Sequence, residues 1–284
     1  MSLSPAPSPK GFRRYQKQWE THARFDALWA VLTLKEKIGG EWDEEHFFQI
    51  GREEIKEVFR YLHVNQLKPN QNGKCLDFGS GVGRLSLALS DYFDEVVGID
   101  ISPTMVAKAT QYAKSKKVRN AKFVLSESAA LSQQLGAGDF DFIYSNITLQ
   151  HIERNLQESY LQEFSKLLKP GGIAVLQIPS RKPAPARWSS ALKVALSLEW
   201  RRMGTVMAMA VRKGVMPWNA QMELNIFPKG EFEAKANEYG FEVGAVAYID
   251  WFSFYESTRF ALSEESQDEL AFYPESPVYF LRKS

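Results

Sequence analysis

The sequence predicts an α/β protein built on a doubly wound, mostly parallel sheet. From residue 74 onward, short apolar runs alternate with segments whose apolar residues recur at helical intervals, a pattern typical of parallel strands covered by helices on both faces. The runs are continuous rather than alternating, as expected for strands buried on both faces. The composition agrees, because 44% hydrophobic and 24% charged residues over 284 positions are ordinary for a globular protein.

The expected elements follow one another in a regular order. Residues 1–14 lack the apolar core of a signal peptide and are expected to be a disordered start. Residues 15–68 are expected to form an N-terminal helical cap, since apolar residues such as Ile55, Val58 and Leu62 define one helical face. Five buried strands are then expected at "KCLDF", "EVVGID", "AKFVLS", "FDFIYS" and "GIAVLQI", with helices at 83–92, 103–116 and 154–168.

The alternation stops after Pro179. A basic, apolar, helical insertion is expected at 181–235, where five of the seven methionines fall within 20 residues. Methionine suits a surface that repacks around a ligand, so this segment is a candidate substrate lid, although a buried helix with a solvated basic face would look the same. Two last strands, at 241–250 and 277–283, are expected to pair antiparallel at the sheet edge. Residues 69–284 would thus form the main domain.

Composition and net charge limit the kinds of partner that this protein is expected to bind. The net charge of +1 supplies no field that favours nucleic acid, and no apolar run approaches the ~18 residues that cross a bilayer. Cys75 is the single cysteine, which excludes an internal disulfide framework and a cysteine-based zinc site. We therefore expect a cytoplasmic protein with no metal centre, no nucleic-acid partner and no membrane span.

The stretch "LDFGSGVGRLSLAL" carries the clearest chemical signal. It reads as strand, turn and helix, with glycines at alternate positions Gly79, Gly81 and Gly83. Such glycines allow a tight turn with positive φ, or a close approach of the main chain to a ligand at the helix N-terminus. Asp100 ends the next strand, 21 residues after Gly79, a spacing that suits a carboxylate bound to ribose hydroxyls.

Three explanations compete for this turn. A dinucleotide site requires G-x-G-x-x-G, but Arg84 stands at the third position and the spacing here is G-x-G-x-G. A phosphate-binding Walker A loop is excluded because no G-K-S/T follows. A turn without any ligand is disfavoured because strand, turn, helix and distal acid all coincide.

Four motifs in order, "LDFGSGVGR", "VVGIDIS", "FDFIYSNITLQHI" and "LLKPGGIAVLQI", resemble the class I S-adenosylmethionine-dependent methyltransferase family. The resemblance covers roughly residues 50 to 180. It implies a seven-stranded sheet of order 3-2-1-4-5-7-6 with strand 7 antiparallel, and S-adenosyl-L-methionine as cofactor, with S-adenosyl-L-homocysteine as product. A cofactor-binding protein without catalysis remains an alternative, because the glycine motif says nothing about turnover.

The resemblance also implies site residues. Around the methionine part of the cofactor it places Asp77, Gly79, Ser80, Gly81 and Gly83. Asp100 would hold the ribose, and Ile101 would pack against the adenine. Near the adenine amine the candidates are Glu127, with Ser128 or Ala129 supplying a backbone N–H. Asn146 and Ile147 would line the place where the methyl group meets its acceptor, at the carboxyl end of the fourth strand.

His151 is the candidate general base, since a neutral imidazole could take a proton from a hydroxyl or amine, while packing of the following helix is the alternative. Basic residues in the insertion favour an acidic, partly apolar small molecule, methylated on oxygen or nitrogen by in-line displacement. An RNA methyltransferase is the rival within the enzyme class, and it would need a continuous basic groove beside 146–151. The oligomeric state is open between a monomer and a homodimer.

Overall fold

The computed structural model describes residues 9–34, 37–181, 208–209, 211–214, 222–249, 260–261 and 276–284. Within these ranges, eight strands form one sheet in the order β3-β2-β1-β4-β5-β8-β6-β7. Their bounds are β1 (Lys74–Phe78), β2 (Glu95–Asp100), β3 (Ala121–Leu125), β4 (Phe140–Ser145), β5 (Leu168–Gln177), β6 (Phe241–Ile249), β7 (Phe260–Ala261) and β8 (Pro277–Lys283).

The strand order confirms the predicted topology. Strands β1 to β5 pair in parallel, and β8 lies antiparallel between β5 and β6, in the place expected for the seventh strand. The eighth strand, β7, is a two-residue addition that pairs with β6 at the edge of the sheet. The carboxyl ends of β1 to β4 therefore meet along one edge, which is where open α/β sheets bind ligands.

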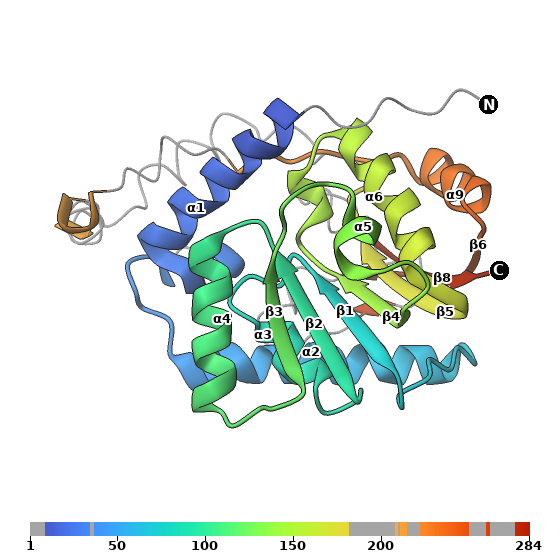
Figure 1. Ribbon diagram of the computed structural model, residues 1–284, viewed down its shortest axis with the longest axis horizontal. Coiled ribbons are helices and arrows are strands. Elements are labelled where there is room, and N and C mark those ends of the chain that lie inside the picture. The colour runs from blue at the N-terminus through green and yellow to red at the C-terminus, as the bar shows by residue number, and fades with distance from the viewer. Residues whose placement is uncertain are drawn as a thin grey trace.

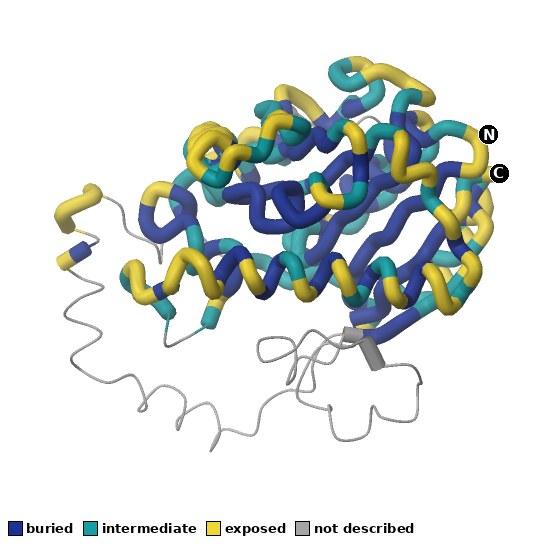
Figure 2. The backbone as a smooth tube through the Cα atoms, turned by 90° about the horizontal axis from the view of Figure 1, so that it is seen from below, coloured by how far each residue is buried: buried dark blue, intermediate teal, exposed yellow. Residues whose placement is uncertain are grey.

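Helices cover both faces of the sheet (Figure 1). On one face the apolar core joins the sheet to α2 (Glu44–Val64), α3 (Arg84–Leu89) and α4 (Pro103–Ser115). On the other face it joins the sheet to α5 (Leu131–Leu135), α6 (Arg154–Leu167) and α9 (Lys229–Glu238). The strands lie buried between these layers (Figure 2). A short 3₁₀ helix, η2 (Leu149–His151), follows β4.

Helix α1 (Pro9–Val31) corrects the prediction of a disordered start at residues 9–14, which are helical. Residues 1–8 of that prediction lie outside the described residues. Phe12 and Tyr15 lie three residues apart and are both buried, at 8% and 3% exposed. Packing of this apolar stripe against the domain stabilises a helix that would be marginal alone. The helix bends at Asp26, whose backbone is not helical (φ −155°, ψ 95°). The Asp26 carboxylate accepts hydrogen bonds from the backbone N–H groups of Trp29, Gly39 and Gly40.

The predicted lid at 181–235 lies mostly outside the described residues. Its described part includes Met209, which packs against Phe25 of α1, and Lys213, whose Nζ donates to the Phe25 carbonyl at 2.6 Å. Within the described part of the chain, every helix is too short or too polar to cross a membrane.

Candidate active site

The glycine turn after β1 is left-handed at all three glycines. Gly79, Gly81 and Gly83 have φ values of +77°, +52° and +85°. A Cβ atom on Gly79 would lie 2.2 Å from Thr148 Oγ1, and one on Gly83 would lie 2.8 Å from Phe123 Cζ. Glycine is thus required twice over, for positive φ and for the missing side chain. The close neighbours in this structure are the chain's own side chains.

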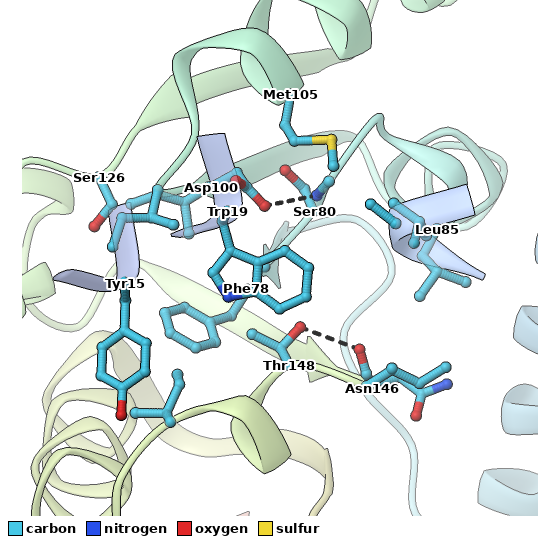
Figure 3. A pocket seen from close by; sticks show the side chains of 18 of the residues that line it. Tyr15, Trp19, Phe78, Ser80, Leu85, Asp100, Met105, Ser126, Asn146 and Thr148 are labelled. Atoms are coloured by element: carbon cyan, nitrogen blue, oxygen red, sulfur yellow. Dashed lines mark hydrogen bonds between the residues drawn. The ribbon is translucent and has the colours of Figure 1, made fainter. Parts of the chain in front are cut away.

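A cavity opens beside this turn, between the carboxyl edge of the sheet and helix α1. Figure 3 shows its lining, with Ser126 and Tyr15 on the left of the view and Leu85 and Asn146 on the right. Of the predicted site residues, the cavity is lined by Gly79, Ser80, Gly81, Asp100, Ile101, Asn146 and Ile147. The structure therefore brings together residues from the ends of β1, β2 and β4.

Asp100 stands at the carboxyl end of β2. Its two carboxylate oxygens accept hydrogen bonds from the backbone N–H of Gly81 at 2.9 Å and of Ser102 at 2.8 Å. Burial raises the pKa of Asp100 to about 6, although the hydrogen bonds from the two N–H donors act to lower this pKa. At pH 7 the cavity therefore holds an ionised acceptor fixed beside the glycine turn.

The end of β3 differs from the prediction. Ser126 lines the cavity, whereas Glu127, Ser128 and Ala129 are not among its lining residues and the Glu127 side chain is exposed. The Ser126 N–H donates to the Asp100 carbonyl at 2.8 Å, so the strand pairing continues one residue past β3. That register brings Ser126 to the cavity and leaves Glu127 on the following loop, where its N–H donates to Gln134.

The end of β4 presents Asn146, Ile147 and Thr148 to the cavity. Ile147 has a φ of +54°, which is strained for a β-branched residue. Its N–H donates to Gln177 Oε1 at 2.9 Å, and this bond helps to fix the unusual backbone. Such strained positions concentrate at functional sites.

Asp77 lies beneath the cavity rather than on its wall. It is 1% exposed, and its Oδ2 accepts a hydrogen bond from Ser86 Oγ at 2.5 Å. Burial raises the pKa of Asp77 to about 7, and the nearby Glu54 and Asp100 carboxylates add to this effect. The prediction that Asp77 surrounds a ligand is therefore corrected to a buried position in the floor, because its side chain turns toward α3.

Two charged residues that sequence reasoning did not assign to the site stand beside it. Arg84, which lines the cavity, pairs through Nη1 with Glu54 Oε2 at 2.8 Å, and both side chains are almost fully buried. Glu54 Oε1 also accepts from Tyr144 Oη and Asn146 Nδ2, each at 2.7 Å. Glu54 stands among charged residues of a helix, so its neighbours in the sequence do not indicate that it is buried. The cluster is therefore recognised only from the fold.

His151 does not line the cavity. Its Nδ1 lies 2.7 Å from the Glu223 carbonyl, which can only accept, so Nδ1 carries the proton and Nε2 faces Gln150 Nε2 at 3.2 Å. Burial lowers the pKa of His151 to about 4, which makes the ring a weak base at pH 7. The Trp19 ring connects His151 to the cavity. Trp19 lines the cavity, and its ring contacts the His151 ring edge-on, with ring centroids 5.0 Å apart. The geometry thus gives His151 a structural part.

Helix α1 covers the cavity from both sides of its bend. The N-terminal part contributes Phe12, Tyr15 and Trp19, and the part after the bend contributes Ala30 and Val31. The helix is tied to the loop that follows Asp100 through Gln16 and Glu20. Gln16 Nε2 donates to the Ile101 carbonyl at 3.2 Å, and the Glu20 carboxylate accepts from Ser102 and Thr104.

Three buried polar atoms on the cavity lining lack a hydrogen-bond partner among the described residues. They are Ser80 Oγ, Arg84 Nε and Asn146 Oδ1, once Arg84 Nη1 is set aside because its neighbour is the ion-paired Glu54 carboxylate. Buried polar atoms normally find partners, so atoms left unpaired on a cavity wall indicate a ligand that supplies them. Within the described ranges, no group of three His, Cys, Asp or Glu side chains is arranged to hold a metal ion.

The comparisons with known proteins agree with this geometry. A family described as "Methyltransferase domain" matches residues 69–222, more than half of the chain. The chain belongs to this family, and its strand order and glycine turn are those of the class I S-adenosylmethionine-dependent methyltransferases.

Among curated relatives, phosphoethanolamine N-methyltransferase 3 of Arabidopsis thaliana is 33% identical over 134 residues, which are 47% of this chain and 25% of that protein. The chain thus spans about a quarter of the length of that relative. Among solved structures, the magnesium protoporphyrin IX methyltransferase of Synechocystis, with bound S-adenosylhomocysteine, is 16% identical with a TM-score of 0.52, over 97% of this chain and 95% of that one. The [4+2]-cyclase SpnF is 13% identical with a TM-score of 0.57, over 99% of both chains. These structures share the fold.

The residues present fit S-adenosylmethionine. This cofactor joins a nucleoside, with ribose hydroxyls that donate hydrogen bonds, to an amino-acid end that carries both charges. The ionised Asp100 beside the glycine turn suits the hydroxyls, and apolar side chains such as Ile101 suit the flat base. The unpaired donor and acceptor on Arg84 and Asn146 suit the charged end.

Proposed function

We propose that this protein transfers a methyl group from S-adenosylmethionine to a nitrogen or oxygen atom of a small molecule. The observation that carries the proposal is the covered cavity in which the Asp100 carboxylate, the glycine turn and unpaired polar atoms meet. The cofactor would supply a methyl group already activated on a sulfonium sulfur, so the protein mainly has to align the acceptor and exclude water.

The chain's own residues divide this work. Asp100 would accept hydrogen bonds from the ribose, Ile101 would pack against the base, and Ser126 would take the place after β3 that was predicted for Glu127. Aromatic side chains of α1 would shield the reacting atoms from solvent. The Thr148 hydroxyl donates to the Asn146 carbonyl at 3.1 Å and so fixes the strand end beside which the acceptor would lie.

The acceptor would be a small amine or alcohol that carries an anionic group. The relatives named for phosphoethanolamine methylation support an amine that bears a phosphate. The basic residues of the insertion support the same class, because Arg201, Arg202, Arg212 and Lys213 lie close together in the sequence. An amine acceptor requires no base from His151, since it can enter the site in its neutral form and its proton stays on the methylated ammonium product.

The direct test is transfer of a labelled methyl group from S-adenosylmethionine to phosphoethanolamine, with ethanolamine and a short RNA as comparison acceptors. We expect label in phosphoethanolamine and an equal yield of S-adenosylhomocysteine, with loss of both in Asp100→Ala. Label in RNA alone would instead support the nucleic-acid rival. Binding of S-adenosylhomocysteine without transfer to any amine or alcohol would contradict the catalytic proposal and support a cofactor-binding protein.

A further inference from the structure

The buried cluster around Glu54 lies at one end of the cavity and joins three separate elements. Glu54 comes from α2, Arg84 from the start of α3, and Tyr144 and Asn146 from the end of β4. Glu54 is 0% exposed and its carboxylate meets all three neighbours at 2.7 to 2.8 Å. Burial of two charges is costly unless hydrogen bonds satisfy both groups, so a cluster of this kind needs an explanation beyond stability.

Glu54 dictates which way the Asn146 amide faces. An ionised carboxylate only accepts hydrogen bonds, so the amide atom 2.7 Å from Glu54 Oε1 has to be Nδ2. The other amide atom, Oδ1, is thereby turned away from Glu54. It is buried on a residue that lines the cavity and has no partner in the described part of the chain.

The same carboxylate fixes the guanidinium of Arg84. Its Nη1 lies 2.8 Å from Glu54 Oε2, while Nε is buried without a partner among the described residues. The guanidinium is planar, so holding Nη1 also sets the direction of the Nε–H bond. Two residues that line the cavity thus hold a buried acceptor on Asn146 and a buried donor on Arg84 that have no partner among the described residues.

We propose that Glu54 is a positioning residue for the recognition of an α-amino-acid zwitterion. The ammonium group of such a ligand would donate to Asn146 Oδ1, and its carboxylate would accept from Arg84 Nε. Within the proposed function, which this inference presupposes, the zwitterion is the amino-acid end of the cofactor. Asn146 lies across the view of Figure 3 from Ser126, so a nucleoside held near Ser126 and an amino-acid end held near Asn146 would have separate places.

Glu54 stands outside the family match at residues 69–222. Gly51 allows helix α2 to pack closely against the start of α3, because a Cβ atom at Gly51 would lie 2.8 Å from the Arg84 carbonyl oxygen. One turn later on the same helix, Glu54 reaches the cluster. The helical region ahead of the first strand therefore completes the site in addition to packing against the sheet.

Two ligands separate this inference from a general structural role. 5′-Methylthioadenosine carries the same thioether nucleoside as S-adenosylhomocysteine but lacks the amino-acid end. We would measure the dissociation constants of both by calorimetry for the wild-type protein, Glu54→Gln and Asn146→Ala. The control is Glu53→Gln, because Glu53 lies on the exposed side of α2 next to Glu54.

We expect both variants to lose about tenfold or more in affinity for S-adenosylhomocysteine, as for a lost hydrogen bond to a charged group, and to keep their affinity for methylthioadenosine. Glu53→Gln should leave both constants unchanged. Because Glu54→Gln leaves Arg84 without its partner and could unfold the protein, Asn146→Ala, which keeps the ion pair, then decides alone. Equal weakening of both ligands, or weakening of neither, would overturn the inference. A wild-type protein that binds neither ligand would overturn the proposed function as well.

Discussion

The hydrogen bonds at the two ends of the cavity join residues that differ in how far apart they lie in the sequence. At the Asp100 end, the carboxylate is bonded to backbone groups 2 and 19 residues away. At the Asn146 end, the bonds of Glu54 reach Tyr144 and Asn146, 90 and 92 residues away. The first end uses strand ends and a glycine turn, where main-chain geometry sets the contacts. The second uses side chains from three elements that only the fold brings together.

This difference predicts how each end fails. Contacts made by the main chain survive most substitutions of neighbouring side chains, whereas a buried cluster depends on every member. A change in the cluster should therefore cost stability first, and a change at Asp100 should cost ligand binding first.

The largest effect is expected for Arg84→Leu. Removing one partner of a buried ion pair leaves Glu54 buried and unpaired, which costs about 3 to 5 kcal/mol in the free energy of unfolding. Arg60→Leu is the matched control, because Arg60 forms an exposed pair with Glu57 on the solvent side of α2 and such pairs contribute about 0 to 1 kcal/mol. Urea unfolding monitored by circular dichroism measures both. Similar losses in the two variants would contradict the claim that the buried cluster depends on every one of its members.

Asp77→Asn tests whether the buried Asp77 carboxyl group titrates in the folded protein. Because the folded-state pKa of Asp77 is raised to about 7, the folded protein binds a proton that the unfolded chain releases near pH 4. The wild-type protein should therefore lose stability relative to the asparagine variant as the pH rises from 5 to 8, by roughly 2 to 3 kcal/mol. Thermal unfolding at pH 5, 6, 7 and 8 gives the comparison. Parallel curves would show that the buried carboxyl does not titrate in this range.

Asp100→Asn should lower the affinity for S-adenosylhomocysteine by roughly 10- to 100-fold, as expected when a charged acceptor of hydrogen bonds is lost. Stability should change less than in Arg84→Leu, since the asparagine oxygen still accepts one backbone N–H. Glu127→Gln is the control at the neighbouring strand end, and its exposed side chain predicts no change. If Glu127→Gln weakened binding as much, the assignment of Ser126 to the cavity would be wrong.

The smallest effect is the pH dependence of that affinity. Hydrogen bonds from ribose hydroxyls favour the ionised carboxylate, so binding should lower the pKa of Asp100 from about 6. Affinity for S-adenosylhomocysteine should then be nearly constant from pH 8 to 7 and fall about tenfold between pH 7 and 5. Calorimetry across this range measures it, and Asp100→Asn should lack this component of the fall.

The same contrast explains what the sequence could predict. The alternation of strands and helices, and the places of the glycine turn and of Asp100 at strand ends, follow from local patterns, because glycine spacing and buried runs lie within short segments. The strand order followed from the resemblance to the methyltransferase family. The residue that lines the cavity after β3 is Ser126 and not Glu127, because strand pairing continues for one more residue. The local sequence does not indicate where this pairing ends. The floor position of Asp77, the satisfied ring of His151 and the Glu54 cluster depend on neighbours far along the chain.

Calorimetric titration of the wild-type protein with S-adenosylhomocysteine, with NAD as the control ligand, tests the central claim most directly. The proposed site predicts a single class of sites with a micromolar dissociation constant, no heat from NAD, and loss of binding in Asp100→Ala. Binding of NAD in place of the adenosyl ligand, or no binding of S-adenosylhomocysteine by the folded protein, would contradict the assignment of this cavity to the cofactor.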